Sequence, residues 1–312
     1  MPFLDLHCDT IARLLAYDRA GFPRSLRDGE DLHINLEKLR QSGYLLQNFA
    51  LFVNLDRTED PLQEVLTLAD VYWREVEANR DLLVPILSRE DLDQIGREGK
   101  IGSLLTVEEG AVCKGRLSVL RMLYRLGVRL LTLTWNHENE LGHPNGKSGG
   151  LTETGFAFLE EMEKLGMLVD VSHLGDDGFW DVCRAAKKPF LASHSSCRAL
   201  WNHPRNLTDE MIKALSDKGG LVGVNFYAGF LGESPVSRTE DMVRHLRHLV
   251  DVGGLSVAAL GSDFDGIDSP LELGDAGGML QLVEALDQGG FTPREIDAIC
   301  WENGMRLYRE VL

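Results

Sequence analysis

The chain has 312 residues, of which 44% are hydrophobic and 26% are charged, a composition typical of a globular protein. Its formal net charge of −17 at pH 7 argues against nucleic acid or an anionic membrane as a partner, because an acidic surface repels phosphate groups. No apolar run reaches the roughly 18 residues that a transmembrane helix needs, and the first residues lack the basic segment of a signal peptide.

Short apolar segments alternate with helical patterns along the whole chain. We predict strands over 2–6, 45–53, 101–107, 128–134, 167–171, 189–193, 221–227 and 257–262. Helices are predicted between them and after them, the longest over 60–79 and the last over 293–308. Apolar strands separated by helices indicate a parallel sheet covered by helices, and eight such strands are the number found in a (β/α)8 TIM barrel. We therefore predict one α/β barrel domain over 1–312, with a doubly wound open sheet as the alternative.

The first predicted strand ends at His7 and Asp9. Residues two apart on a strand point to the same side, so the imidazole and the carboxylate would lie next to each other. They could bind a divalent cation such as zinc, or they could be a buried hydrogen-bonded pair. Chemistry in a barrel takes place at the C-terminal ends of the strands. Other strand ends carry further metal-binding side chains, namely Glu108, His173, His194 and Asp263.

Three histidines and three carboxylates are more than one tetrahedral zinc ion with an open position can use. They suit two Zn²⁺ ions per chain, which share a bridging ligand. Glu108 is the natural bridge, because a carboxylate has two oxygens. His7 and Asp9 would complete one metal site, and His173 and His194 would complete the other. A water held between the two cations would become a hydroxide near neutral pH.

Asp263 could take the proton of that water and pass it to a leaving amine. It could instead be a third ligand or a strand-end cap. Asp265, two residues further on, competes for the same role, and Glu109 is expected to point away from the metals.

Six motifs occur in order: DLHCDT at 5–10, VEEG at 107–110, LVDVSH at 168–173, ASHSS at 192–196, RN at 205–206 and GSDFDG at 261–266. Together they resemble the renal (membrane) dipeptidase family of binuclear zinc peptidases. The resemblance implies a barrel that hydrolyses dipeptides, often with a D-residue at the C-terminal position. The ligands that it implies are His7, Asp9, Glu108, His173 and His194.

The resemblance also implies proton transfer by Asp263 and capture of the free carboxylate of the dipeptide by Arg205. A planar guanidinium matches a carboxylate with two parallel hydrogen bonds. Read without the resemblance, Arg205 would be a solvated surface residue.

One position departs from the family pattern. The fourth strand of the family ends Thr-Leu-Thr-His, and its histidine contacts the substrate and helps to polarise the scissile carbonyl. Here the run ends at Trp135. His137 could take the place of that histidine, or it could be a plain loop residue. Trp135 and Asn136 could line the pocket instead.

These features together predict a zinc-dependent dipeptidase. We expect a cytoplasmic homodimer with free cysteines and a small dipeptide as substrate, whereas the renal family members are secreted and lipid-anchored. One alternative is a related metal-dependent amidohydrolase that acts on N-acyl amino acids or lactones. Another is a non-catalytic metal-binding relative that has kept the fold.

Overall fold

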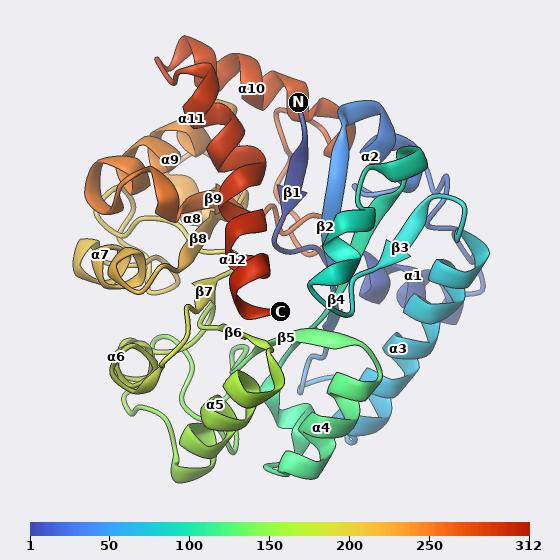
Figure 1. The fold of residues 1–312 in the computed structure, drawn as a ribbon, viewed down its shortest axis with the longest axis vertical. Coiled ribbons are helices and arrows are strands. Elements are labelled where there is room, and N and C mark those ends of the chain that lie inside the picture. The colour runs from blue at the N-terminus through green and yellow to red at the C-terminus, as the bar shows by residue number, and fades with distance from the viewer.

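Eight parallel strands close into a barrel in the computed structural model, which describes residues 1–312 (Figure 1). They are β1 (Phe3–Asp5), β2 (Tyr44–Phe52), β4 (Ile101–Glu108), β5 (Val128–Thr132), β6 (Leu168–Asp170), β7 (Leu191–Ala192), β8 (Leu221–Val224) and β9 (Ala258–Leu260). Each pairs with the next in this order, and β9 closes the ring by pairing with β1. The predicted TIM barrel and its eight strands are confirmed.

A ninth strand, β3 (Leu83–Pro85), was not predicted from the sequence. β3 and β5 pair with the same edge of β4. β3 pairs with its first residues, Ile101–Ser103, and β5 pairs with its later residues, Leu105–Glu108. β3 is only three residues long and ends in a proline, so it lacks the apolar run that marks the other strands.

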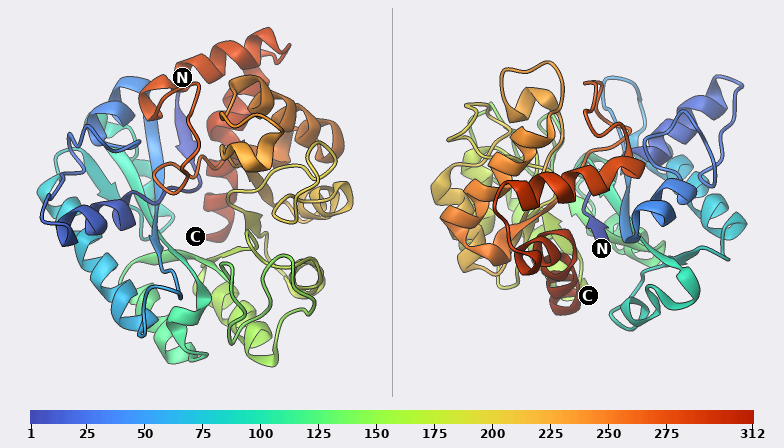
Figure 2. Two further views of the ribbon diagram at one scale, coloured as in Figure 1. Left: turned by 180° about the vertical axis from the view of Figure 1, so that it is seen from behind. Right: turned by 90° about the horizontal axis from the view of Figure 1, so that it is seen from above.

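The helices surround the barrel (Figure 2). They are α1 (Thr10–Arg19), α2 (Leu36–Ser42), α3 (Pro61–Ala78), α4 (Leu117–Arg125), α5 (Glu153–Leu165), α6 (Asp176–Ala185), α7 (Asp209–Asp217), α8 (Ala228–Leu231), α9 (Thr239–Gly253), α10 (Met279–Gln288), α11 (Pro293–Asp297) and α12 (Asn303–Val311). The last predicted helix is divided, because a π-helical turn over Ala298–Glu302 separates α11 from α12. No helix is long and apolar enough to cross a membrane.

The inside of the barrel is filled by aliphatic side chains, with at least one from each of the eight strands. They are Leu4, Leu6, Leu46, Leu104, Leu130, Leu168, Leu191, Leu221 and Ala259. Helix α12 packs Met305, Tyr308 and Val311 against this cluster and lies across one end of the barrel (Figure 1). The hydroxyl of Tyr308 donates to Asn48 Oδ1 at 2.8 Å, which ties the helix to β2. A polar site must therefore lie at the other end, where the strands finish.

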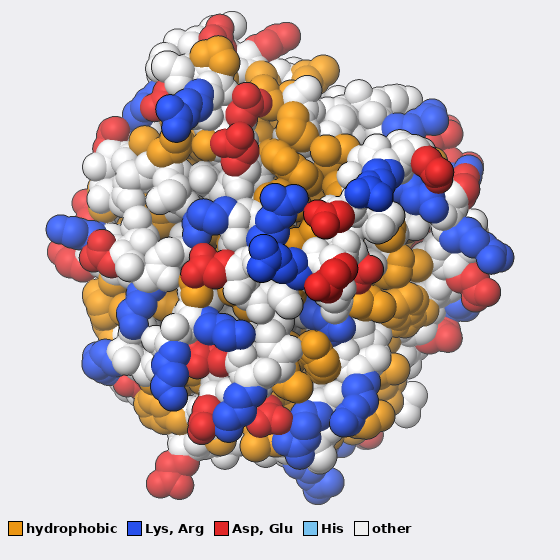
Figure 3. Space-filling view, viewed as in Figure 1, with side chains coloured by type: hydrophobic (Ala, Val, Ile, Leu, Met, Phe, Trp, Pro, Cys, Tyr) orange, Lys and Arg blue, Asp and Glu red, His pale blue; other side chains and the backbone are white.

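The face that carries α12 mixes basic and acidic side chains, with hydrophobic side chains between them (Figure 3). The net charge of −17 is therefore not gathered into one acidic patch on this face.

Candidate metal centre

His7 follows β1 and is buried at the centre of a group of carboxylates. Its Nε2 lies 3.7 Å from Asp9 Oδ2, 3.5 Å from Glu108 Oε2 and 4.0 Å from Asp263 Oδ1. The ends of β1, β4 and β9 thus meet at one imidazole. The structure brings these four predicted residues together.

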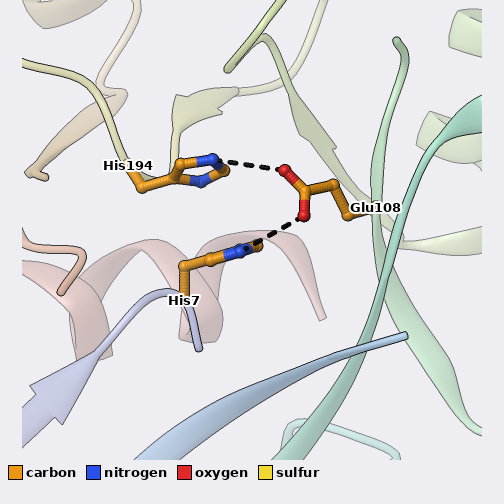
Figure 4. Close-up of side chains that lie close together, drawn as sticks. All are labelled: His7, Glu108 and His194. Atoms are coloured by element: carbon orange, nitrogen blue, oxygen red, sulfur yellow. Dashed lines mark ion pairs between the residues drawn. The ribbon is translucent and has the colours of Figure 1, made fainter. Parts of the chain in front are cut away.

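Glu108, the last residue of β4, lies between His7 on one side and the pair His173 and His194 on the other. Its Oε1 is 3.0 Å from His173 Nε2 and 3.3 Å from His194 Nε2, while Oε2 faces His7 (Figure 4). The two oxygens therefore point to different sides. This is the arrangement that a bridging carboxylate requires.

The donor atoms of this group fit divalent cations. His7 Nε2 and Asp9 Oδ1 are buried and have no hydrogen-bond partner. The Nε2 atoms of His173 and His194 lie 3.0 Å from each other and face the same carboxylate oxygen, Glu108 Oε1. Buried polar atoms are costly unless they are paired or bind a metal. Imidazole nitrogens and carboxylate oxygens are also the ligands that zinc takes in catalytic sites.

The charges at the centre are strongly coupled. Burial would raise the pKa of Glu108, but three imidazoles, His7 foremost, hold it well below its usual range. Burial would lower the pKa of His7, yet the carboxylates of Glu108 and Asp9 raise it well above its usual range. Burial raises the pKa of Asp263 to about 8, and the neighbouring acids act in the same direction. This crowding of acids attracts positive charge.

A chain of hydrogen bonds supports His194 from behind. Its Nδ1 lies 2.7 Å from Ser193 Oγ, and Ser193 Oγ donates to Asp170 Oδ2 at 2.6 Å. Asp170 is fully buried and also accepts from Thr132 Oγ1 at 2.6 Å and from the backbone N–H of Ser172 at 3.0 Å. His173 has a similar support, because its Nδ1 lies 3.0 Å from Asn136 Oδ1. Outer partners of this kind fix the tautomer and the orientation of a metal-binding histidine.

Left-handed backbone conformations cluster at the site. Of six non-glycine residues with positive φ, four lie where strands end at the centre: Glu109, His173, Asp263 and Asp265. Such conformations cost about 1–3 kcal/mol each and persist where the surroundings enforce them. They turn the chain sharply at the strand ends.

The sequence left open whether Asp263 or Asp265 faces the metal centre, and in the structure the two carboxylates point in different directions. Asp263 faces His7, and Asn225 donates to its Oδ2 at 2.9 Å. Asp265 turns the other way and accepts from Thr10 Oγ1 at 2.6 Å and from the N–H of His33 at 2.7 Å. Glu109 points away, as predicted, and its Oε1 accepts from the N–H of Ala111 at 2.8 Å.

A cavity of about 430 Å³ opens above the centre. Trp135 and Asn136 line it, together with Phe52, Tyr227 and Phe230. The structure gives no support to the suggestion that His137 replaces the family histidine, which stays a prediction. His137 is not part of the cavity wall, and its Nε2 pairs with Asp56 Oδ1 at 3.1 Å.

Arg205 is buried rather than solvated, so the interpretation drawn without the resemblance is wrong. Its side chain donates to the carbonyl of His194 at 3.1 Å and to Ser195 Oγ at 3.3 Å. The guanidinium also lies 5.3 Å from the ring centre of Phe230, which lines the cavity. Burial lowers the pKa of Arg205 to about 10. Its Nε–H has no partner and each terminal nitrogen donates only once, which leaves three N–H groups of the guanidinium for further acceptors.

Sequence reasoning missed the residues that support the ligands. Asp170 and Ser193 lie inside motifs already noted, Asp170 three residues before His173 and Ser193 directly before His194, but a serine in a strand carries no signal of its own. Asn225 follows β8, which together with β2 was a strand whose end had been assigned no function. Its position at a strand end was a usable signal.

A family model described as membrane dipeptidase (peptidase family M19) matches residues 1–312. An uncharacterised protein encoded in the pqqA 5′ region of Klebsiella pneumoniae is 34% identical over 267 residues, which cover 78% of this chain and 96% of that protein. An uncharacterised dipeptidase of Schizosaccharomyces pombe is 31% identical over 304 residues, which cover 91% of this chain and 73% of the yeast protein.

Two solved structures are similar over their whole length. A metallopeptidase of Rhodobacter sphaeroides, bound to a phosphinate mimic of the dipeptide L-Ala-D-Ala, gives a TM-score of 0.93 at 26% identity and covers 100% of this chain and 99% of that chain. The metallopeptidase named dipeptidase AC, of family M19, gives a TM-score of 0.94 at 27% identity and covers 100% of this chain and 98% of that chain.

Proposed function

The chain belongs to the membrane dipeptidase family (peptidase family M19) and is a metal-dependent dipeptidase, and we propose that it works with two zinc ions. The proposed ligands are His7, Asp9, Glu108, His173 and His194. One observation carries the proposal: the two oxygens of Glu108 face different histidines, His173 and His194 on one side and His7 on the other. A single carboxylate in that position can serve two cations.

Zinc bound there would supply a Lewis acid for the scissile carbonyl and for the attacking water. The residues of the chain then have three tasks: to hold the dipeptide, to exclude bulk water and to move one proton. The aromatic side chains Phe52, Trp135, Tyr227 and Phe230 line the cavity, so a dipeptide bound between them would displace water from the centre.

Asp263 is the proposed proton carrier. Asn225 holds its Oδ2, which leaves Oδ1 facing His7 at the floor of the cavity. From there the carboxylate would accept a proton from the attacking water and give it to the nitrogen of the leaving amine. The peptide bond between the two residues breaks, and one water is consumed.

Arg205 is the proposed partner of the free carboxylate of the dipeptide. Its guanidinium lies behind His194 and next to Phe230, and its unpaired Nε–H can donate to a carboxylate oxygen. The R. sphaeroides neighbour binds a mimic of L-Ala-D-Ala, which supports a C-terminal D-residue in the substrate. The homodimer expected from the sequence stays a prediction, and light scattering of the purified protein tests it.

The test measures bound metal by mass spectrometry and hydrolysis of a dipeptide panel with L- and D-residues at the C-terminal position. N-acetyl amino acids and lactones are assayed beside it, as substrates of a related amidohydrolase. We expect two zinc ions per chain at full activity and loss of both metal and activity in Glu108→Ala. Glu59→Ala, an exposed glutamate elsewhere on the surface, is the matched control. Full activity with fewer than two metals, or an active Glu108→Ala, would contradict the two-zinc proposal.

A further inference from the structure

Two arginines line the cavity and have no carboxylate partner. Arg13 lies on α1, and Arg57 lies in the segment between β2 and α3; both are exposed. Neither guanidinium forms an ion pair or a side-chain hydrogen bond, and Arg13 only approaches the ring of Tyr17 at 6.0 Å. Nearby arginines behave differently, because Arg19 pairs with Glu64 at 2.7 Å and Arg27 pairs with Asp81 at 2.8 Å.

The acids of the same cavity do not neutralise these two charges. Asp9, Glu108 and Asp263 belong to the metal centre. Asp265 accepts hydrogen bonds from Thr10 and from the backbone of the segment that precedes α2.

Asp268 is the remaining acid of the cavity wall; it is exposed and has no ion-pair partner. Its charge suits the α-ammonium group of a dipeptide. The wall above the metal centre therefore carries two free guanidinium groups and one free carboxylate, in a protein whose net charge is −17.

The two arginines lie across the barrel from Arg205. Arg13 and Arg57 follow β1 and β2, which are neighbours in the sheet, whereas Arg205 follows β7. Around the ring, β8 and β9 separate β7 from β1, and β4, β5 and β6 separate it from β2. A dipeptide has only one α-carboxylate, for which Arg205 is the proposed partner. Arg13 and Arg57 line the cavity and lie far from Arg205 around the ring, so they are free to bind a second anionic group of the substrate.

We propose that Arg13 and Arg57 bind a side-chain carboxylate, so that the enzyme prefers dipeptides containing a glutamyl or aspartyl residue. The inference rests on the proposed function and adds the substrate class to it. Guanidinium–carboxylate hydrogen bonds are among the strong ones in proteins. Because both arginines are exposed, salt should weaken the preference.

The experiment compares acidic dipeptides with their neutral isosteres. It measures kcat/KM for Glu-Ala against Gln-Ala, and for Ala-Glu against Ala-Gln, with the second residue in the L- and the D-form. Three zinc-loaded proteins are assayed: the wild type, the R13Q/R57Q variant, and the R40Q/R80Q variant as control. Arg40 and Arg80 are exposed, lie outside the cavity and form no ion pair, so the control removes the same charge.

We expect the wild type to favour the acidic member of at least one pair by roughly tenfold, the discrimination that one charge-assisted hydrogen bond provides. R13Q/R57Q should bring that ratio close to one, mainly by raising KM, whereas R40Q/R80Q should keep it. Adding salt should reduce the ratio in the wild type and not in R13Q/R57Q.

A ratio near one in the wild type for both pairs overturns the inference, and so does a ratio that survives in R13Q/R57Q. In either case hydrolysis of the neutral dipeptides leaves the proposed function standing. If neither the acidic nor the neutral dipeptides are hydrolysed, both proposals fall.

Discussion

The hydroxyl of Ser193 joins a metal-binding histidine to a buried carboxylate. It donates its only hydrogen to Asp170 Oδ2, at 2.6 Å, so it can only accept from His194 Nδ1, at 2.7 Å. The proton of His194 must therefore lie on Nδ1, and the lone pair on Nε2, the atom that faces Glu108. Ser193→Ala would remove this control of the tautomer without changing any proposed ligand.

The size of the effect follows from the two bonds that are lost. His194 Nδ1 and Asp170 Oδ2 would each lose a partner at positions that are almost fully buried. Loss of an outer partner of a metal-binding histidine lowers metal affinity by roughly 10- to 100-fold. Asp170 Oδ2 would keep the hydrogen bond from Thr132 Oγ1, but the N–H of His194 Nδ1 would be left unpaired, which should also cost about 1–3 kcal/mol of the free energy of unfolding of the metal-free protein.

The assay titrates zinc into metal-free protein against a chromophoric chelator, and records thermal unfolding of the same samples. Ser103→Ala is the matched control, because Ser103 Oγ is equally buried and bonds Tyr72 OH at 2.8 Å, but contacts no proposed ligand. The control should lose stability and keep its zinc affinity. An unchanged zinc affinity in Ser193→Ala, or an equal loss in both variants, would refute the reasoning.

Three further predictions concern the centre itself. A Cβ at Gly266 would overlap the carboxylates of Asp9 and Asp263, so Gly266→Ala should lower the metal content measured by mass spectrometry, and full occupancy would contradict this. Asp263→Asn should lower kcat by roughly 10²- to 10⁴-fold with both metals retained, as expected for a proton carrier; loss of a metal would make Asp263 a ligand instead. Removing the metals with a chelator should lower Tm, because zinc at 1,000 times its Kd stabilises the folded protein by about 4 kcal/mol. A Tm that does not recover when zinc is added back would contradict this link between metal binding and stability.

The fold was predictable because local patterns of apolar residues mark most of its strands and helices. Eight apolar segments separated by helices specify a closed parallel barrel, and β3 was missed because three residues ending in proline carry no pattern. The proposed ligands were predictable for a related reason: each lies at the end of a strand or shortly after it, and the barrel brings the strand ends together.

The outer residues depend on longer-range geometry. Asp170 and Ser193 pair only because β6 and β7 are neighbours in a particular register. Arg13 lies on a helix and Arg57 in the segment after β2, so neither belongs to a strand end that could be aligned with the others. Their common cavity exists only once the ring has closed.

The replacement of the family histidine by Trp135 changes the wall of the cavity rather than its floor. The indole packs edge-on against Phe52, with ring centres 4.9 Å apart, and lies 6.1 Å from the ring of His173. The next residue, Asn136, supplies the polar contact of this segment, and it bonds His173 rather than facing an open position. The imidazole that would have met the substrate carbonyl is thus absent from the end of β5, although Asn136 still lines the cavity there. The same stretch instead holds a proposed ligand and lines the cavity, so we expect the proposed zinc ions to supply most of the polarisation of the carbonyl.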